Sequence, residues 1–178
     1  MADFAAKIDQ MLDGAAQQDL HFGVLCDVVR AALDDAGMAR DGPHRFGVFT
    51  SAQTSDFVEP MATYMVARAV AGTLRTQGPY DNTEAVCSSG YLAVHKAACG
   101  IAGGMCNSAV AGGVSLMLRP EWGIEILLGG ILSLSGSMRP FDAKADGMVW
   151  GEGAAAVVLS NNIDANQCGA DYAGLMGW

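Results

Sequence analysis

The stretch EAVCSSGYLAVH, residues 84–95, contains a cysteine, Cys87, that could act as a nucleophile and a histidine, His95, that could act as a base. Cys87 lies between a run that suits a strand and a small-residue run that suits a helix. At such a junction, unpaired N–H groups and the positive end of the helix dipole favour the thiolate, and the same amides can hold an oxyanion. Cysteine is also among the most buried residue types, so local chemistry leaves a buried core thiol as the alternative to a nucleophile.

The three histidines of the chain offer this cysteine no base. On a continuous helix, His95 would lie about 12 Å along the axis from Cys87 and roughly 80° around it, which is too far to reach the sulfur. His21 is expected at the start of a helix and His44 in a Gly/Pro loop, where solvent or a backbone partner is the commoner fate of a lone histidine. A base for Cys87 must therefore come from elsewhere, or the full reaction does not occur.

Two glycine-containing patterns resemble functional motifs but lie in the wrong context. GEGAAA, residues 151–156, fits a dinucleotide fingerprint but precedes the apolar run AVVLS, so it predicts a tight turn into a strand. A cysteine hydrolase elbow needs glycine two residues before and two after the nucleophile, and Ala85 and Ser89 occupy those positions.

The acidic segment DAKADGMVWGEG, residues 142–153, has a faint likeness to a calcium loop. Its third position is Lys144, and its twelfth is Gly153 where a bidentate glutamate is needed, so calcium is rejected. We expect Asp142, Asp146 and Glu152 to hold this loop near the active site through hydrogen bonds, without acting as acid or base. No metal site is predicted, because no His/Cys cluster has zinc spacing.

Composition limits the function classes. The 178 residues, 51% hydrophobic, are enough for one domain with a core, so residues 1–178 are expected to form a single domain. A net charge of −9 with only 10 Lys and Arg argues against nucleic acid as a partner. The longest apolar run is shorter than the ~20 residues that span a bilayer, and no signal pattern opens the chain. With five cysteines and no disulfide framework, we expect reduced thiols and a soluble cytoplasmic protein that does not bind membranes.

Hydrophobic spacing predicts an α/β sandwich in which helices flank a buried, mostly parallel sheet. Apolar residues recur at three and four in residues 22–38, and Gly37 suits a helix C-cap. The other expected elements are a strand at 45–51, a helix at 59–74, a short stretch at 80–86, a buried central helix after Cys87, strands at 108–118 and 151–160, and a last strand in the tail.

Three ordered blocks resemble the β-ketoacyl synthase family, especially the ketosynthase domains of modular polyketide synthases. They are EAVCSSGYLAVHKAA, AVAGGVSLML and RPFDAKADGMVWGEGAAAVVL, in that order. VVRAALDDAG, GVFTSAQTSDF and RTQGP add weaker likeness. The resemblance runs from about Phe22 to the end of the chain, and it covers only the amino-terminal half of the family's domain, with the usual first strand missing.

This resemblance implies a thiolase-like half: a layered sandwich with a mixed, mostly parallel sheet flanked by helices. It also implies that Cys87 accepts an acyl chain from the phosphopantetheine arm of an acyl carrier protein, with no cofactor bound to this chain. Two histidines in the family's second half drive malonyl decarboxylation and condensation, and none of the three histidines here matches them.

The sequence departs from the family just before the nucleophile. Where polyketide members tend to have V-T-V-D-T-A-C, this chain has DNTEAVC, so that Glu84 and Ala85 replace Asp and Thr. Asp81 and Asn82 place polar groups in a region that the family uses for its dimer contact. Cys87 is retained, which argues against the decarboxylating variants that carry glutamine.

The resulting hypothesis is a β-ketoacyl synthase-like acyltransferase of polyketide or fatty-acid type, with Cys87 as its catalytic residue. It would act on a carrier-bound acyl thioester in decarboxylative C–C condensation. The chain would be inactive in condensation without a partner chain that supplies the missing half and its histidines. It is expected to form either a homodimer or a complex with such a completing chain. The alternative is a non-catalytic half-domain that acts as a scaffold or dimerisation partner of a complete ketosynthase.

Overall fold

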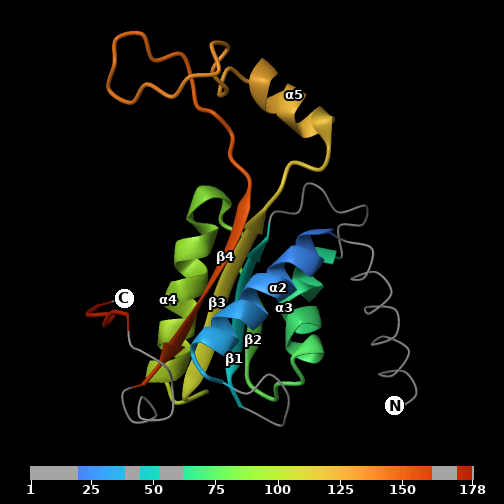
Figure 1. Ribbon diagram of the computed structural model, residues 1–178, viewed down its shortest axis with the longest axis vertical. Coiled ribbons are helices and arrows are strands. Elements are labelled where there is room, and N and C mark those ends of the chain that lie inside the picture. The colour runs from blue at the N-terminus through green and yellow to red at the C-terminus, as the bar shows by residue number, and fades with distance from the viewer. Residues whose placement is uncertain (1–19, 39–44, 53–61, 162–171, 178) are drawn as a thin grey trace. The chain divides into compact units, whose positions relative to one another are not determined.

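The computed structural model describes residues 20–38, 45–52, 62–161 and 172–177, which form two compact units (Figure 1). The first unit comprises residues up to Val114 together with those from Ala154 onward, and the second comprises Ser115–Gly153. In the sequence, the second unit is therefore an insertion within the first.

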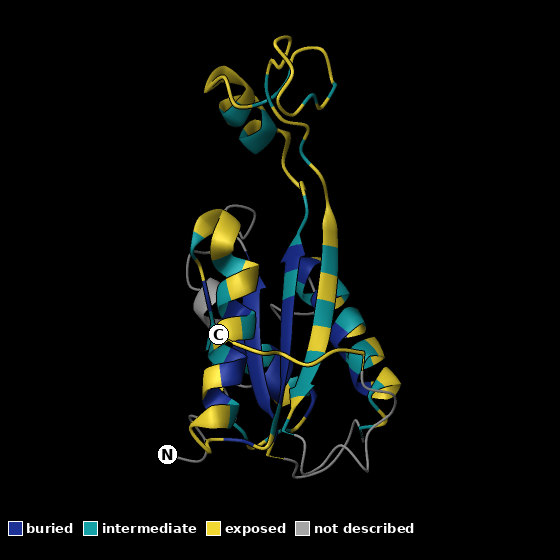
Figure 2. Ribbon diagram, turned by 90° about the vertical axis from the view of Figure 1, so that its left-hand side faces the viewer, coloured by how far each residue is buried: buried dark blue, intermediate teal, exposed yellow. Residues whose placement is uncertain are grey.

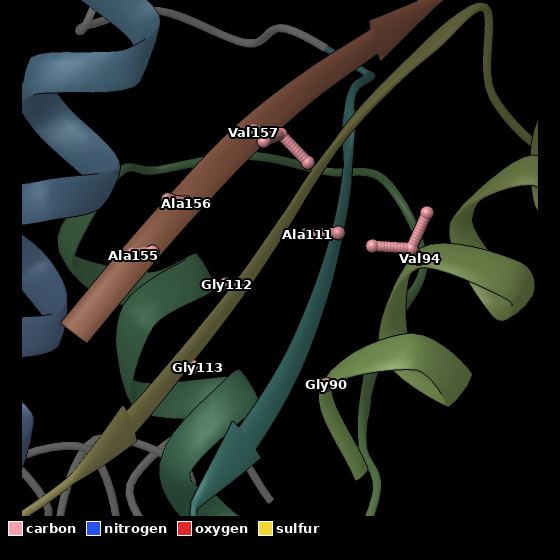
Figure 3. Close-up of a pocket in the computed structure, with 8 residues that line it drawn as sticks. All are labelled: Gly90, Val94, Ala111, Gly112, Gly113, Ala155, Ala156 and Val157. Atoms are coloured by element: carbon pink, nitrogen blue, oxygen red, sulfur yellow. The ribbon is translucent and has the colours of Figure 1, made fainter. Parts of the chain in front are cut away.

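The first unit is built on a four-stranded sheet with the order β2-β1-β3-β4. The strands are β1 (Gly47–Ala52), β2 (Tyr80–Asn82), β3 (Ser108–Ser115) and β4 (Gly153–Ser160). β1 pairs in parallel with β2, where Val48 lies opposite Tyr80, and with β3, where Val48 lies opposite Val110. β4 runs in the opposite direction to β3 (Figure 3). The prediction of a mixed, mostly parallel sheet is therefore confirmed.

Helices lie on both faces of this sheet (Figure 1). α2 (Leu20–Asp35) and α3 (Ala62–Thr73) cover one face, and α4 (Ser89–Ala102) covers the other. α2 is amphipathic, and its Leu25, Val29 and Leu33 are fully buried because residues four apart share one helix face. This is the helix predicted at 22–38.

The core beneath α4 is made of small residues around one aromatic ring. Ala93 and Ala97 of α4 pack against Phe49 of β1 and against Ala109 and Ala111 of β3. Small side chains allow the helix backbone to lie close to the sheet. Figure 2 shows the buried inner side of α4 and its exposed outer side.

This one-sided burial corrects the prediction that α4 is a buried central helix whose start lies inside the molecule. Tyr91 is 84% exposed and Val86, just before the helix, is 78% exposed. The segment has few polar residues because alanine and glycine allow close packing against the sheet on one face. The same small residues can remain exposed to solvent on the other face.

The second unit contains α5 (Pro120–Leu128) and a loop closed by a parallel bridge between Leu132 and Met148. None of its residues is buried. Gly147 in this loop has a φ of +140°, and a side chain there would place its Cβ 2.5 Å from the backbone carbon of Leu132. Only glycine satisfies this position.

The strand expected in the tail is not found among its described residues. Residues 172–177 form no strand, and Tyr172 donates a hydrogen bond to the Asp35 carboxylate at 3.0 Å. Residues 162–171 lie outside the described part of the chain. No helix among the described residues is long and apolar enough to cross a membrane.

Candidate active site

The backbone around Cys87 forms a tight turn between the sheet and α4. Cys87 lies in a short 3₁₀ helix, η2 (Val86–Ser88), which leads directly into α4. Val86 has a φ of +53°, in the left-handed region that β-branched residues rarely adopt. Such a conformation costs about 1–3 kcal/mol and is found at functional sites, where the surrounding structure maintains it.

Two serines hold this turn. The Ser89 hydroxyl accepts a hydrogen bond from the Ala85 amide at 2.8 Å and donates one to the Val86 carbonyl at 2.7 Å. The Ser88 hydroxyl donates to the Ala85 carbonyl at 2.8 Å. Sequence reasoning assigned these serines no role, although serine is a preferred residue at a helix start because its hydroxyl bonds nearby backbone groups.

Cys87 is exposed, so it is not the buried core thiol that local chemistry left open. It lies on the amino-terminal side of α4, where the helix dipole favours a negative charge. Of the other described cysteines, Cys26 and Cys106 are buried and Cys99 is exposed. Burial raises the pKa of the Cys26 thiol to about 11, and it also raises the pKa of the Cys106 thiol.

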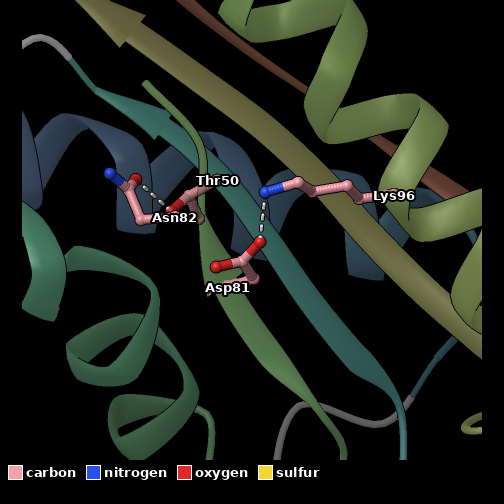
Figure 4. Close-up of polar contacts among 4 residues, drawn as sticks. All are labelled: Thr50, Asp81, Asn82 and Lys96. Carbon is pink, nitrogen blue, oxygen red and sulfur yellow. Dashed lines mark hydrogen bonds and ion pairs between the residues drawn. The ribbon is translucent and has the colours of Figure 1, made fainter. Parts of the chain in front are cut away.

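Polar contacts attach the strand before Cys87 to its neighbours (Figure 4). Lys96 of α4 forms an ion pair with the Asp81 carboxylate of β2 at 2.5 Å. The Thr50 hydroxyl of β1 donates to the Asn82 side-chain oxygen at 2.8 Å. Asp81 and Asn82, which depart from the family pattern, therefore have partners within this chain: Asp81 links β2 to α4, and Asn82 links β2 to β1.

The histidines do not converge on Cys87. The His95 ring nitrogen Nε2 lies 3.6 Å from the Cys99 sulfur, one helix turn further on. His21 is in the first turn of α2, as predicted, but it is buried, with 2% of its surface exposed. His44 lies outside the described residues.

An apolar pocket of about 220 Å³ lies between the first turns of α4 and the sheet (Figure 3). Gly90 and Val94 of α4 line one side, and small residues of β3 and β4 line the other. The lining contains no charged side chain. Its floor is made by Ala111, Gly112, Gly113, Ala155, Ala156 and Val157.

In the second unit, the acidic residues hold the loop through hydrogen bonds, as predicted, and the placement of this loop near Cys87 stays a prediction. Asp146 accepts hydrogen bonds from the Ser133 and Ser135 hydroxyls and from the Ser135 amide, and these bonds lower the pKa of its carboxyl group. Asp142 accepts a hydrogen bond from the Lys144 amide at 2.7 Å. The other carboxylate, Glu152, accepts from the Met117 amide at 2.5 Å. Gly153 begins β4, which confirms that GEGAAA leads into a strand, although residues 151 and 152 form no turn.

Comparisons with known proteins agree with this geometry. The family model for the β-ketoacyl synthase N-terminal domain matches residues 1–165, so the chain belongs to this family. Polyketide synthase ThaG of Burkholderia thailandensis is 38% identical over 141 residues, which cover 72% of this chain and 2% of that protein. The citrinin polyketide synthase of Monascus ruber is 31% identical over 159 residues, covering 81% of this chain and 6% of the relative.

Solved ketosynthases have the same fold. The ketosynthase from module 6 of the bacillaene synthase of Bacillus subtilis 168 superposes with a TM-score of 0.77 at 28% identity, covering 83% of this chain. The oxazolomycin ketosynthase domain of Streptomyces albus JA3453 also gives 0.77, at 31% identity over 85% of this chain. This chain spans 28% and 30% of those two structures, so the thiolase-like half predicted from the sequence is confirmed as a ketosynthase-type amino-terminal region.

Proposed function

We propose that this chain is the acyl-accepting half of a β-ketoacyl synthase-like condensing enzyme, with Cys87 as the nucleophile. The observation that carries the proposal is the exposed Cys87 thiol in a strained turn at the start of α4. Packing of the core does not require a strained turn that is held by two serines and exposes one thiol to solvent. A nucleophile does require such exposure.

The transfer follows from this placement. The Cys87 thiolate attacks the carbonyl carbon of a carrier-bound acyl thioester, and a new C–S bond forms. The carbonyl oxygen becomes an oxyanion, which backbone N–H groups at the helix start are suited to stabilise. The bond to the carrier's phosphopantetheine sulfur then breaks, and the released thiolate takes up a proton from solvent. The phosphopantetheine arm belongs to the carrier protein, and this chain needs no bound cofactor for the step.

Condensation needs groups that this region does not bring to Cys87. A decarboxylation assisted by histidines would require imidazoles near the sulfur, and His95 is engaged with Cys99 while His21 is buried. We therefore propose that a partner chain supplies the histidines. The small-residue pocket beside α4 supports close packing by such a partner.

Acyl transfer is tested by incubating the full chain with an acyl carrier protein that carries a short acyl chain. Mass spectrometry of the peptides then identifies the residue that received the acyl group. We expect one acyl group on Cys87, and none on that peptide in Cys87→Ser. Cys99→Ser is the matched control, because Cys99 is also exposed but lies toward the other end of α4. Acylation shared equally by Cys87 and Cys99, or absent with the completing chain present, would refute the assignment.

A second candidate is a non-catalytic scaffold for a complete ketosynthase. The second unit favours it, since none of its residues is buried and it offers apolar surface for association. A scaffold would bind a ketosynthase equally well as Cys87→Ser and would never become acylated. Acylation of Cys87 therefore separates the two functions.

A further inference from the structure

A second pair of reactive side chains lies on α4, away from Cys87. His95 and Cys99 are separated by four residues, which places them on the same face of the helix. Both are exposed, and His95 Nε2 lies 3.6 Å from Cys99 Sγ. Cys87 lies about 18 Å along the helix direction from Cys99, so this pair is separate from the nucleophile.

The distance between these two donor atoms matches the distance between two ligand atoms of a tetrahedral zinc ion. Zn–S bonds are about 2.3 Å and Zn–N bonds about 2.0–2.1 Å, so the sulfur and nitrogen of two ligands at the tetrahedral angle lie about 3.5 Å apart. The observed 3.6 Å needs almost no movement. Thiolate and imidazole are also the donors that zinc prefers.

The electrostatic setting also suits a cation. Cys99 lies in the last turn of α4, which ends at Ala102, and the partial negative charge at a helix carboxyl end favours positive charge. The neighbouring cation, Lys96, is ion-paired with Asp81. That pairing reduces its repulsion of a second cation.

We propose that His95 and Cys99 form an open two-ligand site for a soft divalent metal ion such as Zn²⁺. Among the described residues no group of three or more His, Cys, Asp or Glu side chains could hold a metal, so water or an added donor would complete the coordination. Binding replaces the thiol proton: the S–H bond breaks, an S–Zn bond forms and one proton enters solution.

The test is a titration of the tag-free full chain with Co²⁺, which reports a thiolate ligand through a sulfur-to-cobalt absorption band. We expect a saturable band, release of about one proton per metal, and loss of the band when Zn²⁺ is added. Cys99→Ser should abolish the band. Losing even an outer-shell partner costs about 10–100-fold in metal affinity, so His95→Gln should weaken binding by more than about tenfold. Cys87→Ser should bind as the unchanged protein does.

A measurement on the unchanged protein tests the site without depending on whether the variants fold. Zn²⁺ should slow the alkylation of Cys99 and leave that of Cys87 unchanged. No cobalt band, or an equal band in Cys99→Ser, would show that His95 and Cys99 form a hydrogen-bonded pair only. Zinc protection of both thiols to the same degree would also overturn the site.

Discussion

The described thiols differ in two physical properties, exposure and position along a helix. Cys26 and Cys106 are buried, and desolvation raises the pKa of each. Cys87 and Cys99 are both exposed, yet they lie toward opposite ends of α4. Because the helix dipole favours a thiolate only at the amino-terminal end, exposure alone does not decide their reactivity.

We predict that iodoacetamide alkylates Cys87 first at near-neutral pH, followed by Cys99 and then by Cys26 and Cys106. Peptide mapping over time, in the presence of a metal chelator, measures the order. The completing chain is added in a parallel sample. Labelling of Cys87 no faster than that of Cys26 would identify it as an inert thiol, contrary to the proposed function.

Asp146 provides a pH-dependent prediction for the second unit. Its hydrogen bonds lower the pKa of the folded carboxyl group below 3.8, so its contribution to stability is present above that pH and is lost as the pH falls through the lower folded value. We expect the protection factor of the Ser135 amide, which is the intrinsic exchange rate divided by the observed rate, to fall under acid conditions. Asp146→Asn should lower this protection factor at neutral pH.

Asp142→Asn is the matched control for this substitution. Asp142 accepts a backbone hydrogen bond from Lys144, and an amide oxygen can still accept it, so its exchange pattern should change little. Equal effects of the two substitutions would mean that Asp146 does not hold the loop.

At the scale of elements, the turn before β2 depends on close backbone contact. Thr76 donates its hydroxyl proton to the Phe46 carbonyl at 2.6 Å, and the Gly78 amide donates to the Thr76 hydroxyl at 3.1 Å. A Cβ at Gly78 would overlap that carbonyl oxygen. The loop between α3 and β2 therefore packs directly against the segment entering β1.

We predict that Gly78→Ala destabilises the protein by about 1–3 kcal/mol, because backbone must move to make room. Gly72→Ala is the control: Gly72 lies within α3, and a Cβ added there would have no other atom within 4 Å. Alanine there should stabilise the helix by about 0.5–1 kcal/mol. Urea unfolding measures both, and equal midpoints for the two variants would contradict the close packing.

At the scale of the whole molecule, much apolar surface is uncovered. The mean hydropathy is +0.25, and the second unit has no buried residue. Its most exposed large apolar side chains are Leu128, Leu134 and Phe141. Soluble monomers rarely expose contiguous apolar patches of more than a few hundred Å², so such surface favours association.

We therefore predict an obligate oligomer, either a homodimer through the strand before Cys87 or a complex with a completing chain. Light scattering on the purified protein measures the mass. Leu134→Lys should weaken association with a completing chain through the apolar surface of the second unit, whereas a polar change at exposed Tyr172 in the tail should not. A stable monomer that binds no hydrophobic dye would contradict the prediction.

The catalytic consequence is tested separately. The chain alone should release no carbon dioxide from a malonyl carrier protein, because no described histidine is available to Cys87. Addition of the completing chain should restore the release. Robust decarboxylation by the purified chain alone would overturn the need for a partner.

Local signals in the sequence were enough to predict most elements and the position of Cys87. The spacing of Leu25, Val29 and Leu33 predicts a helix with one buried face because a helix turns every 3.6 residues. The junction at Cys87 follows from a change of residue type along the chain. The three motif blocks of the family can be recognised, in their order, from the sequence alone. Their resemblance to the family therefore predicts the sheet without any tertiary information.

Only the tertiary structure decided which surfaces are covered. Alanine and glycine in α4 have no strong polar or apolar preference, so its one-sided burial and the exposure of Cys87 depend on what packs against the helix. The Lys96–Asp81 and Thr50–Asn82 contacts join residues 15 and 32 positions apart, which no local pattern specifies. Spacing could place His95 and Cys99 on one face, but their donor distance depends on side-chain rotamers, which are set in three dimensions.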